Sequence, residues 1–395
     1  MLPAVFVPKI PLVTERAATA ARARRAPAAW ACGALAAAAL AIVAGCGAGD
    51  GTKRELPAGP PTSAGPGPLV LYASLGQANQ VVAYRLGADG LLPADPFSAI
   101  DLENPRRMLL NGNILYVLLP DRVVSIAINN DGSLPSIPTS VTAVIEEGNP
   151  LDLALFGDVL YVAYEDLEQL IAYRLVLGHV PAGALSASGT GNSDYQAVAA
   201  NQRFVFAATP RERSVHTYLK IGQGALPVDP QSEVARIDFP DDMLIHNGVL
   251  YAADGIDRRI LGWFIPDTGI LPEDPDFETL RVESYVEMVI NDDLGLLYAS
   301  GFNRGRLDTF RINPIDGSFL DDKPVTSTAQ DVASFPNGMD LAGGILYVAL
   351  AGRDRIDAYI VASNGALPRF PSSSTNVIPD AFPNDAKVGL FPTGS

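Results

Sequence analysis

The sequence predicts an all-β fold, a seven-bladed β-propeller closed by its C-terminal strand. The prediction rests on a pattern that returns seven times after residue 68 and on its period, which lies near 45 residues. A repeat of this length with several strands per copy is typical of a propeller, in which each four-stranded sheet buries its faces against the next. A β-sandwich, the main alternative, would not keep four separate features in register over so many copies.

The pattern is clearest in residues 345–368. Residues 345–350 are all apolar, which predicts a strand that is buried on both faces. A polar hairpin tip at residues 353–355 leads to a second strand around Tyr359, and Asn364-Gly365 provides residues that tolerate positive φ in a tight turn. The repeat unit is therefore predicted to be antiparallel.

Four sequence features recur at nearly constant spacing along the chain. The aromatic anchor of the first strand recurs at Tyr72, Tyr116, Tyr161, Phe206, Tyr251, Tyr298 and Tyr347, with gaps of 44, 45, 45, 45, 47 and 49 residues. The anchor of the next strand recurs at Tyr84, Ile126, Tyr173, Tyr218, Trp263, Phe310 and Tyr359. A turn glycine follows at Gly90, Gly132, Gly178, Gly224, Gly269, Gly317 and Gly365. A proline closes this turn in every copy except the sixth.

Each repeat is predicted to hold an inner strand, the aromatic strand, a third strand and an outer strand. The inner strands are expected to begin near Pro105, Pro150, Tyr195, Pro240, Tyr285 and Pro336. The first blade begins at Leu69 without an inner strand, but residues 382–385 match residues 239–242 and 335–338. We therefore expect the segment that ends at Leu390 to complete the first blade and join the two chain ends non-covalently.

The N-terminal region predicts secretion. Residues 1–27 hold five basic residues against one acid, and an apolar run over residues 28–45 follows. Residues 1–45 are therefore predicted to be a signal peptide, with a transmembrane anchor as the alternative, although the run is at the short limit for spanning a membrane.

The apolar run ends in Val43-Ala44-Gly45-Cys46, which resembles the lipobox of bacterial lipoproteins. The resemblance implies cleavage before Cys46 and acylation of that residue, so we expect the mature protein to be anchored to the membrane in the cell envelope. Residue 47 is Gly and not Asp, and by the same resemblance this implies an outer-membrane destination if the cell is Gram-negative. Residues 46–67 are rich in Gly and Pro and predict a flexible tether, and residues 68–395 form the predicted propeller domain.

Charge and cysteine content exclude several functions. Loss of residues 1–45 would leave 23 basic and 43 acidic side chains, a net charge of −20. Such a surface disfavours nucleic acid as a partner, and we expect a monomer. Cys32 would be removed and Cys46 acylated, so the mature domain would have no thiol for a disulfide, a metal site or catalysis.

The spacing and the LYV…Y…G-x-L-P pattern over residues 69–390 resemble the seven-bladed lactonase family, which includes 6-phosphogluconolactonase-type propellers. Members of that family carry a Pro-Arg-His motif at the start of an inner strand. The best match here is Pro105-Arg106-Arg107, with Arg in place of the His, and none of His179, His216 and His246 lies at such a start. The resemblance therefore implies a lactonase-like fold without the family's catalytic histidine, and we predict no catalytic residue.

A polar position recurs just before the apolar run of each inner strand. Its occupants are Arg107, Asp152, Ala197, Asp242, Glu287, Gly338 and Asp385, and a methionine follows directly in four copies. One interpretation is that each acid caps a turn and each methionine fills a gap between blades. The other is a charged ring at the mouth of the central channel that binds a ligand.

Like charges gathered at one channel mouth require either retained protons or a cation. Arg107 is expected to offset only one of them. Oxygen ligands without His or Cys favour a hard ion, so Asp152, Asp242, Glu287 and Asp385 form a candidate Ca²⁺ site.

Arginines recur at the hairpin tips of blades four to seven. The tips are residues 211–213, 257–259, 303–306 and 353–355, on the face where the inner strands are expected to begin. Local ion pairs explain them as solvated tips, whereas an anionic partner would make Arg106, Arg304 and Arg353 binding residues together with the polar ring.

Three functions remain open from the sequence. The first is an envelope-anchored propeller that binds a ligand or protein partner on one face. The second is a lactonase or sugar-phosphate lactone hydrolase that uses Arg and carboxylates, and the third is a structural envelope protein.

Overall fold

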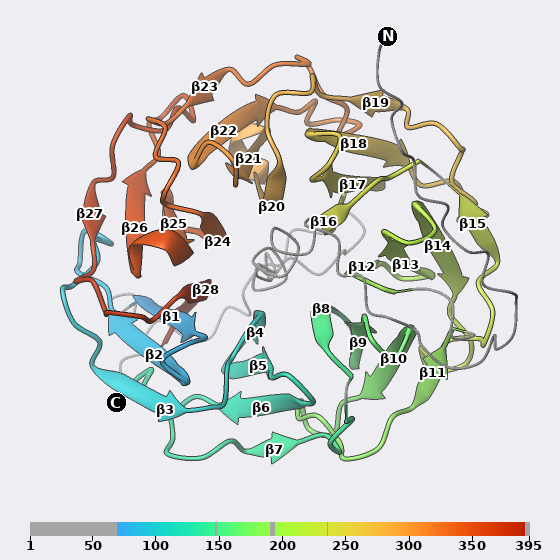
Figure 1. The fold of residues 1–395 in the computed structure, drawn as a ribbon, viewed down its shortest axis with the longest axis horizontal. Helices are drawn as coiled ribbons and strands as arrows, with labels where there is room; N and C mark the ends of the chain where they lie inside the picture. Colours follow the sequence, from blue (N-terminus) through green and yellow to red (C-terminus); the bar gives the residue numbers. More distant parts are fainter. Residues whose placement is uncertain (1–68, 147, 190–193, 235, 392–395) are drawn as a thin grey trace, which may run out of the picture.

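The computed structural model describes residues 69–391 except residues 147, 190–193 and 235. These residues form seven four-stranded antiparallel sheets arranged in a ring (Figure 1), and two short 3₁₀ helices complete the described elements. The predicted all-β, seven-bladed propeller is therefore confirmed. The signal peptide, Cys46 and the tether lie outside the described residues, and no helix among the residues described is long and apolar enough to cross a membrane.

The strands of each blade follow one another from the centre of the ring outward. Blade one holds β28 (Pro383–Leu390), β1 (Leu69–Leu75), β2 (Gln80–Arg85) and β3 (Ser98–Asp101). Blade two holds β4 (Met108–Asn111), β5 (Ile114–Leu118), β6 (Val123–Ala127) and β7 (Ser140–Val141). Blade three holds β8 (Pro150–Phe156), β9 (Val159–Tyr164), β10 (Gln169–Arg174) and β11 (Ser186–Ser188). Blade four holds β12 (Ala197–Ala200), β13 (Phe204–Thr209), β14 (Ser214–Leu219) and β15 (Ser232–Val234).

The remaining blades repeat this order. Blade five holds β16 (Pro240–His246), β17 (Val249–Asp254), β18 (Arg259–Phe264) and β19 (Phe277–Glu278). Blade six holds β20 (Tyr285–Asn291), η1 (Asp292–Leu294), β21 (Leu296–Gly301), β22 (Arg306–Arg311) and β23 (Thr326–Ser327). Blade seven holds β24 (Pro336–Ala342), β25 (Ile345–Leu350), η2 (Ala351–Arg353), β26 (Arg355–Ile360) and β27 (Ser373–Ser374).

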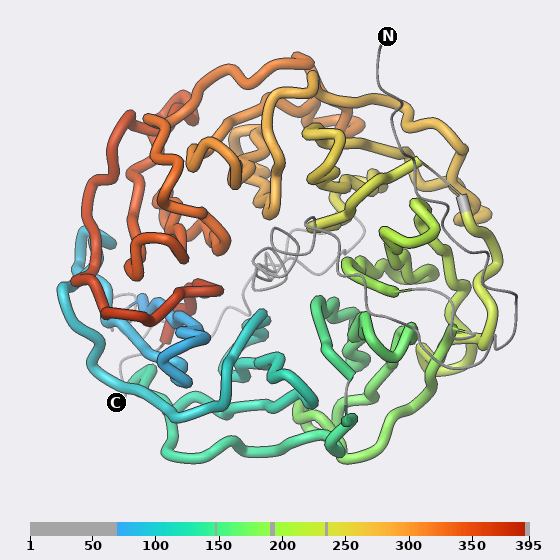
Figure 2. Tube along the Cα trace, in the orientation of Figure 1, coloured from blue at the N-terminus to red at the C-terminus, as the bar shows by residue number. Residues whose placement is uncertain are grey.

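The last strand closes the ring. β28 pairs antiparallel with β1 from Leu69 opposite Leu390 to Ser74 opposite Asp385. The two ends of the described chain therefore share one sheet, where the blue and red segments meet in Figure 2. This arrangement confirms the predicted closure by the C-terminal segment.

Apolar side chains fill the space between neighbouring blades. Seven hydrophobic clusters each combine residues of two adjacent blades, and Met108, Met243, Met288 and Met339 are buried in four of them. The alternation of side chains along a strand explains this, because each sheet offers one face to each neighbour. The methionines therefore fill gaps between blades.

A tyrosine hydroxyl links most neighbouring blades. The anchor tyrosine of one blade donates a hydrogen bond to the carbonyl of the turn glycine of the next, at 2.7 Å for both Tyr72 to Gly132 and Tyr347 to Gly90. The same link joins Tyr116 to Gly178, Tyr161 to Gly224, Tyr251 to Gly317 and Tyr298 to Gly365. Phe206, the one anchor without a hydroxyl, cannot make it.

The turn glycines are needed for two reasons. Gly90 has a φ of 75°, which L side chains rarely adopt, and a Cβ there would lie 2.5 Å from Ile345 Cδ1 of blade seven. Conformation and close approach therefore both exclude a larger residue at this position.

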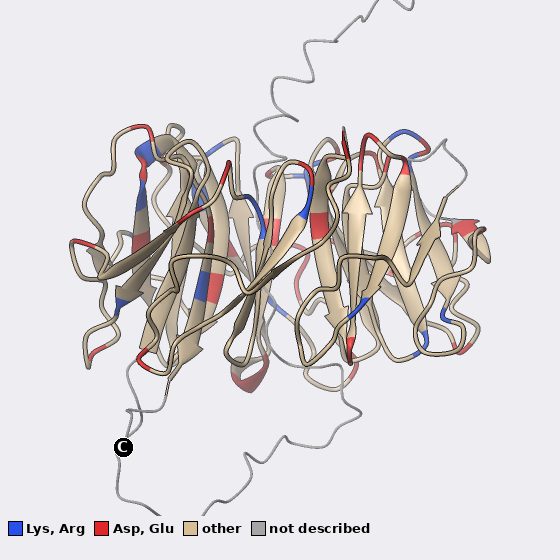
Figure 3. Ribbon diagram, turned by 90° about the horizontal axis from the view of Figure 1, so that it is seen from below, with Lys and Arg blue, Asp and Glu red and all other residues tan. Residues whose placement is uncertain are grey.

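The ring has two faces that differ in the turns they carry. At the front face the inner strands begin and the hairpin tips between the second and third strands lie. At the back face the inner strands end and the turn glycines lie. Acidic and basic residues are interspersed along both faces (Figure 3).

Deletion of residues 382–395 is expected to destabilise the whole ring, because blade one would lose its inner strand and expose the cores on both sides. Apolar burial contributes roughly 25 cal/mol per Å², so loss of an eight-residue inner strand should lower the melting temperature sharply. Thermal unfolding followed by circular dichroism checks this, with deletion of residues 392–395 as the control. A cooperative transition at the wild-type temperature would contradict closure by β28.

Candidate functional site

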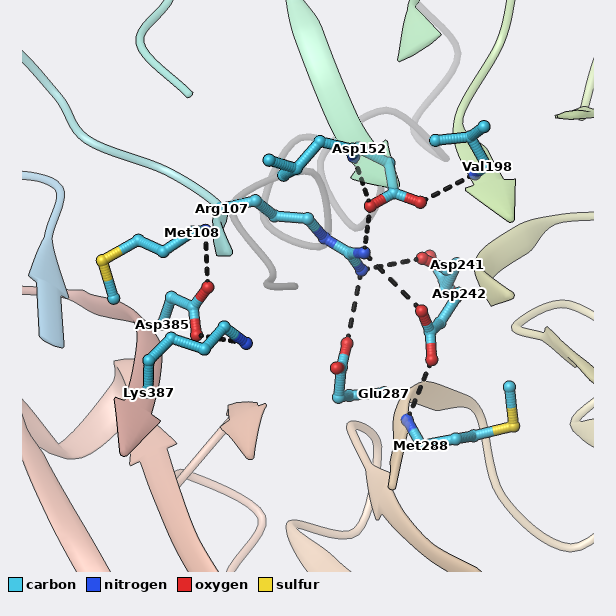
Figure 4. A network of polar contacts seen from close by, with 11 residues as sticks. Arg107, Met108, Asp152, Val198, Asp241, Asp242, Glu287, Met288, Asp385 and Lys387 are labelled. Atoms are coloured by element: carbon cyan, nitrogen blue, oxygen red, sulfur yellow. Dashed lines mark hydrogen bonds and ion pairs between the residues drawn. The ribbon is translucent and has the colours of Figure 1, made fainter. Parts of the chain in front are cut away.

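Five residues of the predicted polar ring converge inside the central channel. Arg107 precedes β4, and the four acids of the ring lie on four inner strands (Figure 4): Asp152 on β8, Asp242 on β16, Glu287 on β20 and Asp385 on β28. All five are between 0% and 5% exposed. They therefore lie within the channel wall, deeper than the solvent-exposed mouth that the sequence suggested.

Arg107 contacts three carboxylates from different blades. Its Nη1 lies 2.6 Å from Asp152 Oδ1 and 3.6 Å from Asp242 Oδ1, and its Nη2 lies 3.4 Å from Glu287 Oε2. Nη2 also donates a hydrogen bond of 3.2 Å to the carbonyl of Asp241. The expectation that Arg107 would offset only one acid is wrong, because the guanidinium has several donors and reaches across the channel from blade two to blades three, five and six.

A second buried cation accompanies Asp385. Lys387 Nζ lies 3.4 Å from Asp385 Oδ1, and both side chains are fully buried. The repeat pattern does not mark this lysine, although it is two residues after Asp385 on the same strand and so on the same face. The channel therefore contains two buried cations, Arg107 and Lys387, next to its acidic side chains.

Four acids also bond to the backbone of the following blade. Asp385 Oδ2 accepts from the N–H of Met108 at 2.6 Å, and Asp152 Oδ2 accepts from Val198 at 2.7 Å. Asp242 and Asp340 accept in the same way from Met288 and Val388, at 3.0 and 2.7 Å. The acids thus act as caps, but they cap the inner strand of the neighbouring blade and not a turn of their own.

Burial decides the protonation of this network. Burial opposes the charge of Arg107, but the nearby Asp152, Glu287 and Asp242 outweigh it and raise the pKa of the guanidinium above its usual value. Burial raises the pKa of Asp242 to about 6, and burial together with the charge of Asp242 raises the pKa of Glu287 well above its usual value. Arg107 is therefore charged, and burial favours the protonated form of Glu287.

The channel does not resemble a metal centre. Within the part of the chain that the structure describes, no group of three or more His, Cys, Asp or Glu side chains is placed to hold a metal ion. Arg107 occupies the space among three of the four acids of the candidate site. The Ca²⁺ hypothesis stays a prediction.

A half-buried arginine lies at the front rim between blades two and three. Arg106 Nη1 donates hydrogen bonds to Asn149 Oδ1 and, at 3.4 Å, to the carbonyl of Pro150. Asn149 Nδ2 in turn donates to Glu165 Oε2 at 2.7 Å. Burial lowers the pKa of Arg106, and burial together with the charges of Asp166 and Asp194 raises the pKa of Glu165 to about 7.

The arginines of the hairpin tips have partners within the chain. Arg353 lies 2.6 Å from Asp331, and Arg304 lies 3.8 Å from Glu283. The other tip arginines pair with Glu168, Asp238, Asp257, Asp308 and Asp357, except Arg258, which donates to the carbonyl of Val282. These contacts agree with solvated tips, while an anionic partner for them stays a prediction.

His216 belongs to a buried chain of polar groups that the sequence did not reveal. Its Nε2 lies 2.7 Å from Glu212 Oε2, and its Nδ1 lies 3.1 Å from the hydroxyl of Tyr195. The Tyr195 hydroxyl is also 2.5 Å from that of Tyr218. Burial lowers the pKa of His216, so it is a neutral packing residue near pH 7.

Comparison with known proteins shows the fold. No protein-family model and no curated protein matches the chain. A candidate 6-phosphogluconolactonase from Bacteroides fragilis is 14% identical with a TM-score of 0.64, and the match covers 82% of this chain and 98% of that one. The periplasmic gluconolactonase PpgL from Pseudomonas aeruginosa is 15% identical with a TM-score of 0.63, over 83% and 100% of the two chains.

The chain has the fold of the 6-phosphogluconolactonase-like seven-bladed propellers. The lactonase-like architecture predicted from the repeat is therefore confirmed. At sequence identities of 14% and 15%, the likeness shows that the fold is shared and does not show a shared activity. Arg107, the last residue of Pro105-Arg106-Arg107, is buried and points into the channel network (Figure 4).

Replacement of Arg107 by Met should destabilise the protein by about 3–5 kcal/mol at neutral pH, because it leaves buried carboxylates without their cation. The loss should shrink at lower pH. Burial already gives Asp242 a folded-state pKa of about 6 against a usual 3.8, so the folded state binds more protons in this window. The extra proton that Asp242 binds in the folded state stabilises the fold fully below the usual pKa of 3.8. This stabilisation is lost as the pH rises through the folded-state pKa of about 6.

Chemical denaturation of both proteins at about pH 5 and about pH 8 measures the difference. Arg174→Met, which removes an exposed ion pair with Asp158, is the control and should cost no more than about 1 kcal/mol at either pH. An Arg107→Met loss that is equal at the two pH values would contradict the assigned charges.

Proposed function

We propose that this protein is a cell-envelope lipoprotein, anchored through acylated Cys46, whose propeller binds a small anionic ligand at the front rim. The signal-like N-terminus and the lipobox-like residues 43–46 support the anchoring. The likeness to a periplasmic gluconolactonase agrees with a place outside the cytoplasm. The single observation that supports ligand binding is that the guanidinium of Arg106 hydrogen-bonds to neutral groups at the front rim.

Arg106 is half-buried, yet its side chain bonds to an amide and a backbone carbonyl in place of a carboxylate. The guanidinium thus hydrogen-bonds to neutral groups while the charges of Glu165 and Asp166 act on it, and its donors form a planar fork. The paired arginines of the hairpin tips lack this freedom. A sugar acid or its phosphate provides the planar or tetrahedral anion that such a fork recognises.

A second candidate function is lactone hydrolysis, and Glu165 is the observation that favours it. A carboxyl group with a pKa of about 7 can accept a proton from water near neutral pH, which is the task of a general base. Arg106 lies near enough for its charge to act on Glu165 and could stabilise a developing oxyanion. Two of the structural neighbours are named as a 6-phosphogluconolactonase and a gluconolactonase, which belong to the same class of reaction.

Replacement of Arg106 by Gln should weaken binding of 6-phosphogluconate by about 10- to 100-fold, because one charge-assisted hydrogen bond contributes about 1.5–3 kcal/mol. Isothermal titration calorimetry measures the affinity, and Arg353→Gln, at an exposed arginine already paired with Asp331, is the matched control. Equal affinity of wild type and Arg106→Gln, or no binding of gluconate or 6-phosphogluconate by the wild type, would contradict the proposal.

A lactone assay separates the two functions. Hydrolysis of gluconolactone or its 6-phosphate that rises with pH through about 7 and disappears in Glu165→Gln would establish the enzyme. Binding without turnover would leave the ligand-binding function alone.

Replacement of Cys46 by Ser should abolish acylation, since this thiol is the one acylation site that the lipobox-like sequence offers. Metabolic labelling with a radioactive or clickable fatty acid, followed by cell fractionation, checks it. The variant is expected to be unlabelled and either released from the membrane or left as a precursor. Label retained by the variant would overturn the lipobox assignment.

A further inference from the structure

Lys220 interrupts the repeat at a position that is aliphatic in every other blade. Its backbone N–H bonds to the carbonyl of Arg203, the contact that follows the third strand in all seven blades. The residues that make the same contact elsewhere are Leu86, Ile128, Leu175, Ile265, Ile312 and Val361. An amine has therefore replaced an apolar side chain at one point between blades three and four.

Lys220 is held by aromatic and backbone groups. Its Nζ lies 4.2 Å from the ring centre of Phe156 and 4.9 Å from that of Tyr161, both on blade three. Nζ donates a hydrogen bond of 2.5 Å to the carbonyl of Asn201. No carboxylate of the described residues lies within ion-pair distance of it. The side chain is thus positioned tightly but not neutralised.

A cavity of about 390 Å³ opens at Lys220 on the back face, on the side of the ring opposite Arg106. Arg203 also lines it, stacked over Phe204 at 5.1 Å, and its guanidinium has no ion pair among the residues described. Asp158 is the one acid in the lining, and Arg174 already pairs with it at 3.1 Å. In a chain with a net charge of −16, this pocket is locally positive.

The environment also favours a reactive amine. Burial lowers the pKa of Lys220 from 10.5 to about 8. A larger share of Lys220 is therefore unprotonated near neutral pH than for an exposed lysine, and the free lone pair is what a nucleophilic amine requires.

We propose that this pocket binds a small carbonyl compound that carries an anionic group, and that Lys220 condenses with it to form an imine. Arg203 pairs with the anionic group and places the carbonyl carbon against Nζ. The Nζ lone pair forms the C–N bond, and the electrons of the carbonyl bond move to oxygen. That oxygen takes up the protons released by nitrogen and leaves as one water molecule, so the step needs no oxidant or reductant.

The test uses the full-length protein and pyridoxal 5′-phosphate, a probe with both an aldehyde and a phosphate. Borohydride reduces any imine to a stable amine, and peptide mass spectrometry then gives the labelled fraction of each lysine. Lys323, which is exposed, is the internal control. Labelling of Lys220 should exceed that of Lys323 by about tenfold or more, since each unit of lower pKa increases the neutral fraction about tenfold.

Two variants separate the roles of the residues. Lys220→Leu restores the side-chain type of the other blades, so it should fold with an unchanged or higher melting temperature and lose the label at this site. Arg203→Gln should reduce labelling of Lys220 several-fold and leave Lys323 unchanged, as should use of pyridoxal, which lacks the phosphate. Equal labelling of Lys220 and Lys323 overturns the reactive lysine, and a preference that survives both Arg203→Gln and pyridoxal overturns the anion site.

Discussion

Hydrogen bonds from buried tyrosine hydroxyls to turn-glycine carbonyls fix the spacing between most neighbouring blades. Each link needs a tyrosine near the start of one blade and a left-handed glycine near the back of the next. A buried hydroxyl must find a partner, and the glycine carbonyl is the partner that the ring geometry brings to it. The link recurs although the repeat length varies from 44 to 49 residues.

Ion pairs and hydrogen bonds of charged side chains connect the blades at the centre of the ring, whereas tyrosine hydroxyls connect them farther out. Arg107 connects blade two with blades three, five and six, while Asp385 and Asp340 connect blade one with its two neighbours through backbone N–H groups. Removing one partner of such a network leaves an uncompensated buried charge, whereas an apolar channel would have no such liability. The network therefore contributes a defined arrangement of the blades around the axis more than it contributes stability.

The repeat made the fold predictable, since anchors, glycines and inner-strand starts recur at positions that the structure confirms. It also identified Arg107 and its acids as one set, because equivalent positions of a closed ring face the same axis. Which of them touch could not be read from the sequence: Arg107 reaches past the nearest blade, and that reach depends on the channel width. Lys387 could not be predicted either, because it has no counterpart in the other repeats and lies on β28, which comes from the C-terminal end of the described chain. The chain of Tyr195, His216 and Glu212 combines a residue of β14 with two residues outside the strands, and no local pattern marks it.

The pairing of β28 with β1 has a consequence for how the protein matures. The first strand to be synthesised waits for its inner partner until residues 383–390, almost at the end of the chain, have been made. Until then blade one cannot bury its inner edge, and the contact that closes the ring joins Leu69 to Leu390, the two ends of the part of the chain that the structure describes. The inner edge of β1 therefore stays without its partner strand while the other six blades are made, and the ring closes only when β28 arrives.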